Sequence, residues 1–178
     1  RSSAASDVYK RQTLNIPKGS IYGIIGENGA GKTTTINALL NLVHRDSGII
    51  KFRGKDISTD EKAFKDKIGV VFDSGCFYDE LTIKDMTALL SPAYSEWDNH
   101  IYKQYLERFS LQQEQTIGTL SKGMKMKYAL ALALSHNAEL LIMDEPTSGL
   151  DPVSRDELLK ILSEYIDCLL YTSPSPRD

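Results

Sequence analysis

The sequence predicts an α/β fold with a mostly parallel sheet, and three observations support this. Residues 26–33 read GENGAGKT and match the phosphate-loop pattern G-x-x-x-x-G-K-[ST]. An apolar, β-branched run at 20–25 precedes the loop as a buried strand would, and apolar residues at helical spacing follow it at 33–43. Further on, the apolar run LLIM at 140–143 ends in two acids. Because ligands of open α/β sheets lie at the carboxyl ends of strands, both features predict one phosphate site.

The phosphate loop has the chemistry of a nucleotide site. A glycine-rich loop aims backbone N–H groups and the positive end of a helix at phosphate oxygens. A glycine-rich turn before a helix is the plainer alternative, but the strand, loop and helix context favours the nucleotide site. We expect Lys32 to reach the β/γ-phosphates and Thr33 to hold Mg²⁺. The residues expected to bind the nucleotide in this loop are Gly26, Glu27, Asn28, Gly29, Ala30, Gly31, Lys32, Thr33 and Thr34.

Both ends of the chain resemble translated sequencing adapter. Residues 7–12 are encoded by gat-gtg-tat-aag-aga-cag, and its reverse complement, read from the second base, encodes residues 168–173. Residues 1–12 and 168–178 are therefore set aside as non-native, as an expression tag would be. We expect residues 13–167 to be part of a longer protein, and the 178-residue chain by itself to turn over little ATP.

Composition excludes several classes of protein. The chain is acidic, with a net charge of −3 and no basic block, so nucleic acid is not an expected partner. Lys122, Lys125 and Lys127 form a small cluster that is typical of a solvated helix face. Cys76 is the one cysteine in 13–167, which indicates a packing role and a reducing compartment. The chain contains no run of about 18 apolar residues, the length that a membrane-spanning helix needs.

The other elements follow in chain order. Residues 48–54 are a predicted antiparallel strand, and 64–67 a short helical approach to a buried strand at 68–72. Residues 78–109 have core-forming apolar spacing and are predicted helices broken at Ser91 and Pro92. Residues 128–134 alternate as a strand would, but alanine and leucine are strong helix formers and Ser121 is a good N-cap, so we predict a helix. A buried strand at 140–143 and an amphipathic helix at 153–165 complete the fold.

Two acids follow the strand at 140–143. Asp144 suits the Mg²⁺ shell, and Glu145 suits orientation or deprotonation of an attacking water. An acid pair at a strand end is weak evidence by itself. Together with the phosphate loop it indicates phosphoryl chemistry.

The chain resembles the ATPases of ABC transporters over essentially all of 13–167. LSKGM at 120–124 is similar to the signature motif of that family, and LLIMDEPTSGLDP at 140–152 to its Walker B motif plus D-loop. The resemblance implies a P-loop NTPase core of ABC ATPase type, with a mostly parallel sheet, an antiparallel β subdomain and a helical insert at about 74–135. It implies an ATPase with Glu145, Lys32 and Asp151 as catalytic residues. Thr33, Asp144 and Asp73 would bind metal, and Ser121, Gly123 and Met124 would bind the γ-phosphate.

Three departures from the family pattern stand out. The aromatic residue that stacks on adenine would lie upstream of the phosphate loop, and Tyr9 is not taken for it because it lies in the adapter-like segment. The switch histidine would lie beyond residue 167, whereas His44, His100 and His136 are expected to be surface or packing residues. Asp73 replaces the usual glutamine, and a carboxylate can contact Mg²⁺ or water but cannot donate as an amide does.

The resemblance also implies partners. It predicts a head-to-tail dimer with a second ATPase subunit and ATP at the interface, and a transmembrane permease that contacts residues 73–110. The expected location is cytoplasmic, on the inner face of the cell membrane. The LSKGM variant and residues 73–78 look more like bacterial export-type systems than importers. A soluble ABC-type ATPase acting on ribosomes or DNA is the alternative, but the twin cassettes, long insertion or basic arms that it needs are not found in 13–167.

Overall fold

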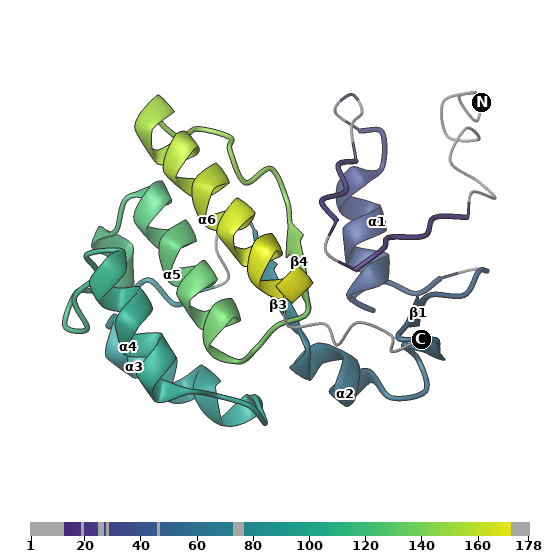
Figure 1. Ribbon diagram of the computed structural model, residues 1–178, viewed down its shortest axis with the longest axis horizontal. Helices are drawn as coiled ribbons and strands as arrows, with labels where there is room; N and C mark the ends of the chain where they lie inside the picture. Colours follow the sequence, from purple (N-terminus) through teal and green to yellow (C-terminus); the bar gives the residue numbers. More distant parts are fainter. Residues whose placement is uncertain are drawn as a thin grey trace. The chain divides into compact units, whose positions relative to one another are not determined.

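The structure is a computed structural model that describes residues 13–18, 20–24, 27, 29–45, 47–72 and 77–171, with side chains to residue 167. The chain divides into two compact units, residues 1–47 with 159–178 and residues 48–158, and each is treated separately. The elements, labelled in Figure 1, are α1 (Lys32–Leu39), β1 (Lys51–Phe52), β2 (Lys55–Asp56), α2 (Glu61–Asp66), β3 (Ile68–Val71), α3 (Ile83–Leu90), η2 (Ser91–Ala93), α4 (Asn99–Arg108), η3 (Ile117–Thr119), α5 (Lys122–Ser135), β4 (Leu140–Met143) and α6 (Pro152–Tyr171).

The strand predicted at 20–25 is not formed in its described part. Residues 20–24 have no regular structure, and Ile21 and Tyr22 are 72% and 53% exposed. A strand depends on a ladder partner for its backbone hydrogen bonds. Among the described residues, ladders join only β1 to β2 and β3 to β4. The apolar run therefore has no ladder partner among them, and this prediction was wrong for residues 20–24.

The helix that follows the phosphate loop is shorter than the predicted 33–43. It ends at Leu39 because Asn41 adopts the left-handed conformation, with φ 57°. This is a typical αL termination, in which backbone N–H groups return to the last turn. Here the N–H of Leu42 donates to the carbonyl oxygen of Asn37 at 2.8 Å, and Ile36 and Leu40 remain buried.

The second unit is built on the parallel pair β3 and β4. Ile68 lies opposite Leu140 and Val71 opposite Met143, which confirms both predicted strands, although β3 stops one residue early. Helix α5 packs on β3 and, on another side, on α4. Its alanines and leucines from 129 to 134 are all buried. The helix that we predicted at 128–134, despite the strand-like alternation, is thus confirmed. A helix that is buried on all sides is apolar all round, which explains the unusual sequence pattern.

The antiparallel element is a short hairpin. β1 and β2 pair through Lys51 with Asp56 and Phe52 with Lys55, so only part of the predicted strand 48–54 is formed. Arg53 and Gly54 connect them with φ 52° and 78°, as a two-residue type I′ turn requires. The ring of Phe52 meets that of Phe64 edge-on at 5.3 Å between centroids. This contact joins the hairpin to α2.

The predicted helices in 78–109 are confirmed as α3 and α4, separated by η2 at Ser91 and Pro92. In Figure 1, α3 and α4 lie beside α5. Hydroxyl groups from the three helices meet in the core. The Thr87 hydroxyl donates to the carbonyl oxygen of Ile83 at 2.8 Å. It also lies 2.6 Å from the Tyr102 hydroxyl and 2.8 Å from that of Tyr128. All three hydroxyl-bearing residues are buried, so this cluster cross-links the three helices.

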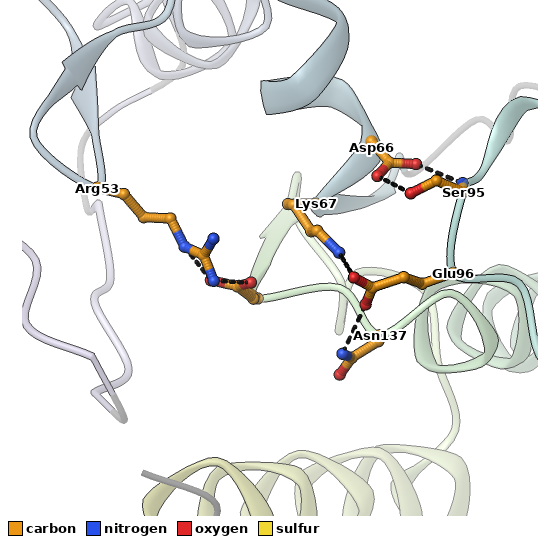
Figure 2. A network of polar contacts seen from close by, with 7 residues as sticks. Arg53, Asp66, Lys67, Ser95, Glu96 and Asn137 are labelled. Carbon is orange, nitrogen blue, oxygen red and sulfur yellow. Dashed lines mark hydrogen bonds and ion pairs between the residues drawn. The ribbon is translucent and has the colours of Figure 1, made fainter. Parts of the chain in front are cut away.

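A polar network holds the segment between η2 and α4 at the start of β3 (Figure 2). The backbone N–H and hydroxyl of Ser95 both donate to the Asp66 carboxylate. Lys67 pairs with Glu96 at 2.5 Å, and the Asn137 side chain donates to the same carboxylate at 2.9 Å. These contacts lie at the amino end of β3, whereas the predicted phosphate chemistry needs its carboxyl end. Their role is to hold the helices around α5 in place.

Candidate functional site

The described part of the phosphate loop leads directly into α1. Gly29 and Gly31 have φ 86° and 92°, a conformation that other residues rarely adopt. The N–H of Ala30 donates to the carbonyl oxygen of Glu27 at 3.1 Å, which closes the turn. The ammonium of Lys32 donates to that same oxygen at 3.2 Å. The lysine side chain therefore folds back over the loop, where phosphate oxygens would compete for its protons.

The first turn of α1 presents the predicted hydroxyl groups. Thr33 and Thr34 are exposed, and Thr35 uses its hydroxyl on the Gly31 carbonyl oxygen at 2.9 Å. The residue at the N-cap position is Gly31, which has no side chain to cap the first N–H groups. The positive end of a helix is where anions bind most readily. Gly26, Asn28 and Asp73, which the sequence also placed in the site, lie outside the described residues.

The two predicted carboxylates follow β4 immediately. The N–H of Asp144 donates to the Val71 carbonyl oxygen at 3.0 Å, so its backbone continues the β3–β4 ladder. Glu145 is exposed and has φ 46°, an unusual conformation for a residue with a side chain. Such residues cluster at functional sites, where surrounding structure holds the strain. The backbone therefore leaves its extended conformation directly after Asp144.

Residues 146–151, here called the D-loop, connect these acids to α6. The N–H of Ser148 donates to the Glu145 carbonyl oxygen at 3.0 Å. Asp151 then caps α6, because its carboxylate accepts from the N–H and the hydroxyl of Ser154 at 3.0 and 2.6 Å. The hydroxyl is the main cause, and the N–H the next, of a lowered pKa of Asp151. The carboxylate therefore stays ionised at neutral pH.

The signature residues form the beginning of α5. Ser121 caps this helix, since its hydroxyl oxygen accepts from the N–H of Met124 at 3.2 Å. Gly123 faces the start of α6: a Cβ added to it would lie 3.5 Å from the Ser154 hydroxyl and 3.6 Å from Leu150. The structure thus brings Gly123 next to Leu150 of the D-loop, which sequence spacing alone did not predict.

The lysine cluster differs from its sequence interpretation as a solvated face. Lys125 pairs with Asp79 at 2.7 Å and Lys127 with Glu157 at 2.7 Å, and both lysine side chains are three-quarters or more buried. Lys122 lies over Gly149 of the D-loop. Sequence reasoning missed these contacts because their partners are distant in the chain. For the contact of Asp151 with Ser154, in contrast, the sequence carries a local signal, the helix-capping pattern D-x-x-S at 151–154.

Whether the described residues could hold Mg²⁺ depends on the donor atoms that they offer. Within the part of the chain that the structure describes, no three His, Cys, Asp or Glu side chains could hold a metal ion together. Mg²⁺ is commonly held by one or two carboxylates, substrate phosphates and waters, and not by an all-protein cage. A hydroxyl from Thr33 and a carboxylate from Asp144 are oxygen donors of this kind and fit that mode of binding.

Comparisons with known proteins agree with these motifs. Residues 9–148 match the family model described as ABC transporter. The chain is 37% identical over 151 residues to the bacitracin transport ATP-binding protein BcrA of Bacillus licheniformis, covering 84% of this chain and 49% of that protein. It is 37% identical over 174 residues to the linearmycin resistance ATP-binding protein LnrL of Bacillus subtilis (strain 168), covering 93% of this chain and 56% of that protein.

A solved structure matches as well. The structure of cbiO1 from Clostridium perfringens, described as part of the ABC transporter complex cbiONQ, has a TM-score of 0.71 and 27% identity. The match covers 88% of this chain and 66% of that one. The chain spans about half the length of the curated relatives it matches. Among its described residues, no helix is long and apolar enough to cross a membrane.

Proposed function

The chain belongs to the ABC transporter family, and we propose that the full-length protein binds and hydrolyses ATP to power transport through a partner membrane permease. The observation that carries the proposal is the loop around Lys32. Two glycines with positive φ lead into a helix end without a side-chain cap, and the ammonium rests on a loop carbonyl oxygen. This geometry suits a loop that binds the phosphates of a nucleotide.

In this proposal the loop residues Gly26 to Thr34 hold the phosphates. The Lys32 ammonium moves from the Glu27 carbonyl oxygen to the β/γ-phosphates, because an anionic oxygen is the stronger acceptor. The Thr33 hydroxyl and the carboxylates of Asp144 and Asp73 would hold Mg²⁺, which neutralises charge on the phosphates when bound.

Glu145 would orient or deprotonate the attacking water. It is exposed at the carboxyl end of β4, where its backbone has a left-handed conformation. Asp151 would act from the far end of the D-loop, where the capping contacts to Ser154 hold its carboxylate. Both carboxylates belong to one short segment, so their separation depends on the conformation of the D-loop.

A second subunit would complete each site. Ser121, Gly123 and Met124 lie at the beginning of α5, whose N–H groups and positive end suit the γ-phosphate of an ATP held by the partner subunit. A permease would contact residues 73–110, so the protein would lie on the inner face of the cell membrane. Relatives named for bacitracin transport and linearmycin resistance support an export-type system.

The proposal is tested with two substitutions in the full-length protein. Lys32→Ala removes a charged hydrogen bond worth about 1.5–3 kcal/mol, so we expect ATP binding to weaken about 10- to 150-fold. Glu145→Gln keeps the shape and loses the base, so it should still bind ATP, accumulate closed dimers and hydrolyse about 100-fold or more slowly. Lys62→Ala, which replaces an exposed lysine of α2, is the matched control.

The measurements are binding of a fluorescent ATP analogue, phosphate release and size-exclusion chromatography with ATP. Near-normal binding by Lys32→Ala would remove the loop from the nucleotide site. Normal phosphate release by Glu145→Gln would remove that carboxylate from the mechanism.

A further inference from the structure

The beginning of α5 and the D-loop approach each other at Lys122 and Gly149. A Cβ added to Gly149 would lie 3.6 Å and 4.0 Å from Cδ and Cε of Lys122, and 3.4 Å from its Nζ. Two of these three nearest atoms are methylene carbons. The lysine stem therefore lies along the glycine, as long charged side chains commonly cover apolar or backbone surface. Gly149 has φ 67°, so the position is occupied by a residue that tolerates both the conformation and the close neighbour.

Among the described contacts, few hold the middle of the D-loop. The N–H of Leu150 reaches the Thr147 carbonyl oxygen at 3.4 Å, a long contact for a hydrogen bond. Ser148 and Gly149 are exposed. At the two ends the loop is better held, by the Glu145 turn and the Asp151 cap. Packing by one side chain in the middle thus has more effect here than it would in a densely bonded loop.

We propose that Lys122 is a positioning residue, whose methylene stem holds the D-loop through Gly149 and so keeps Glu145 and Asp151 in place for hydrolysis. The inference rests on the proposed ATPase function and adds a residue that the phosphate-loop and carboxylate assignments do not include. Its neighbours in α5, Ser121 and Gly123, face the γ-phosphate in the proposed dimer. Lys122 thereby connects two segments of one chain. One is the beginning of α5, which would bind the ATP held by the partner subunit, and the other is the segment that carries Glu145 and Asp151.

The stem and the charge are separated by two substitutions. Lys122→Met keeps methylene-like packing on Gly149 without the ammonium, whereas Lys122→Ala removes both. Lys160→Ala, which replaces an exposed lysine of α6, serves as the control. A residue that holds a loop should be replaceable by methionine, while a residue that binds phosphate through its charge should not.

The first readout is amide hydrogen exchange from milliseconds onward, followed on a peptide that covers 146–151, without ATP. We expect Lys122→Ala to speed exchange about 5-fold, and Lys122→Met to stay within about 2-fold of the unsubstituted protein. The second readout is ATP turnover by the full-length protein. Lys122→Ala should lower kcat about 5- to 10-fold with KM changed less than about 2-fold, and Lys122→Met should keep at least about half of kcat.

Three results would overturn the inference. Methionine failing as badly as alanine would assign the effect to the charge. Unchanged exchange in Lys122→Ala would show that the side chain does not hold the loop. Faster exchange with unchanged kcat would show that the held loop does not matter for hydrolysis. If the unsubstituted protein shows no turnover, the proposed function fails, while exchange still decides whether Lys122 holds the loop.

Discussion

Substituting Gly69 tests the packing that places the strand ends. Gly69 lies on β3 directly beneath α5, where an added Cβ would meet the Cβ of Ala133 at 2.4 Å and Cδ2 of Leu141 at 2.6 Å. The leucine can rotate, but the Cβ of Ala133 moves only with the helix backbone. Carbon atoms at optimal separation lie about 3.5 Å or more apart, so Gly69→Ala must push helix and strand apart by about 1 Å.

Two opposing effects set the size of the change. The backbone of Gly69 does not have a positive φ, so alanine can adopt its conformation. Alanine lowers the conformational entropy of the unfolded chain, which stabilises the folded protein by about 0.5–1 kcal/mol. Overpacking a core costs about 1–3 kcal/mol. Because the displaced atom belongs to a helix that also packs on α4, the upper half of that range applies. We expect a net loss of about 1–2 kcal/mol in the free energy of unfolding.

The assay is equilibrium urea unfolding, followed through the fluorescence of Trp97, the single tryptophan. Its ring is half-buried and packs 5.1 Å from that of Tyr102. With a slope near 2 kcal/mol/M, the midpoint should fall by roughly 0.5–1 M. Gly23→Ala is the matched control, because no atom of the described residues lies within 4 Å of its Cβ position and its φ is not positive.

A compensating substitution makes the test specific. Ala133→Gly removes the closest atom and by itself costs about 1 kcal/mol in helix propensity. The double variant Gly69→Ala with Ala133→Gly should be at least about 1 kcal/mol more stable than the sum of the single effects. Additive effects, or a Gly69→Ala midpoint equal to that of Gly23→Ala, would refute the close approach of α5 to β3.

Two further predictions concern the helices around α5. The Ser95 hydroxyl, and then its N–H, lower the pKa of Asp66, so this stabilisation is present above about pH 4 and is lost as pH falls through the folded-state pKa. Ser95→Ala should therefore unfold at lower urea than the parent at pH 7, and urea titrations at pH 3 should show a smaller difference; a constant difference would contradict this assignment. Thr87→Val leaves the buried hydroxyls of Tyr102 and Tyr128 without their shared partner and should cost about 1–3 kcal/mol in urea unfolding. An unchanged midpoint would mean that the cluster does not cross-link the helices.

Local chemistry accounts for what the sequence predicted correctly in the second unit. Ser121 caps α5 as its residue type favours, and Pro92 coincides with the break between α3 and α4. The buried strands at 68 and 140 were predicted from short apolar runs. Helix α5 was predicted from the helix propensity of alanine and leucine, although its apolar residues alternate as in a strand. The helix is buried on all sides, so its sequence has no one-sided apolar pattern that would have indicated a helix.

The sequence predictions failed where strand pairing, or a residue with a left-handed backbone conformation, determines whether an element forms or where it ends. Residues 20–24 have a strand-like sequence, but a strand exists only if a neighbour completes its hydrogen bonds, and sequence does not supply that neighbour. Asn41 ended α1 early through a positive φ that its residue type permits but does not require. The phosphate loop was predicted from a local pattern, and the positive φ of Gly29 and Gly31 suits such a loop. That these residues bind phosphate stays a prediction.

The phosphate-loop pattern, the acids after an apolar strand and the succession of helices could be predicted from the sequence, because each depends on residues a few positions apart. The close approach of α5 to β3 at Gly69, and that of Lys122 to Gly149, are visible only in the folded chain. It also decided that Lys125 and Lys127 are ion-paired and not merely solvated. These contacts join residues many positions apart, and their geometry follows from how whole elements pack, which no local pattern encodes.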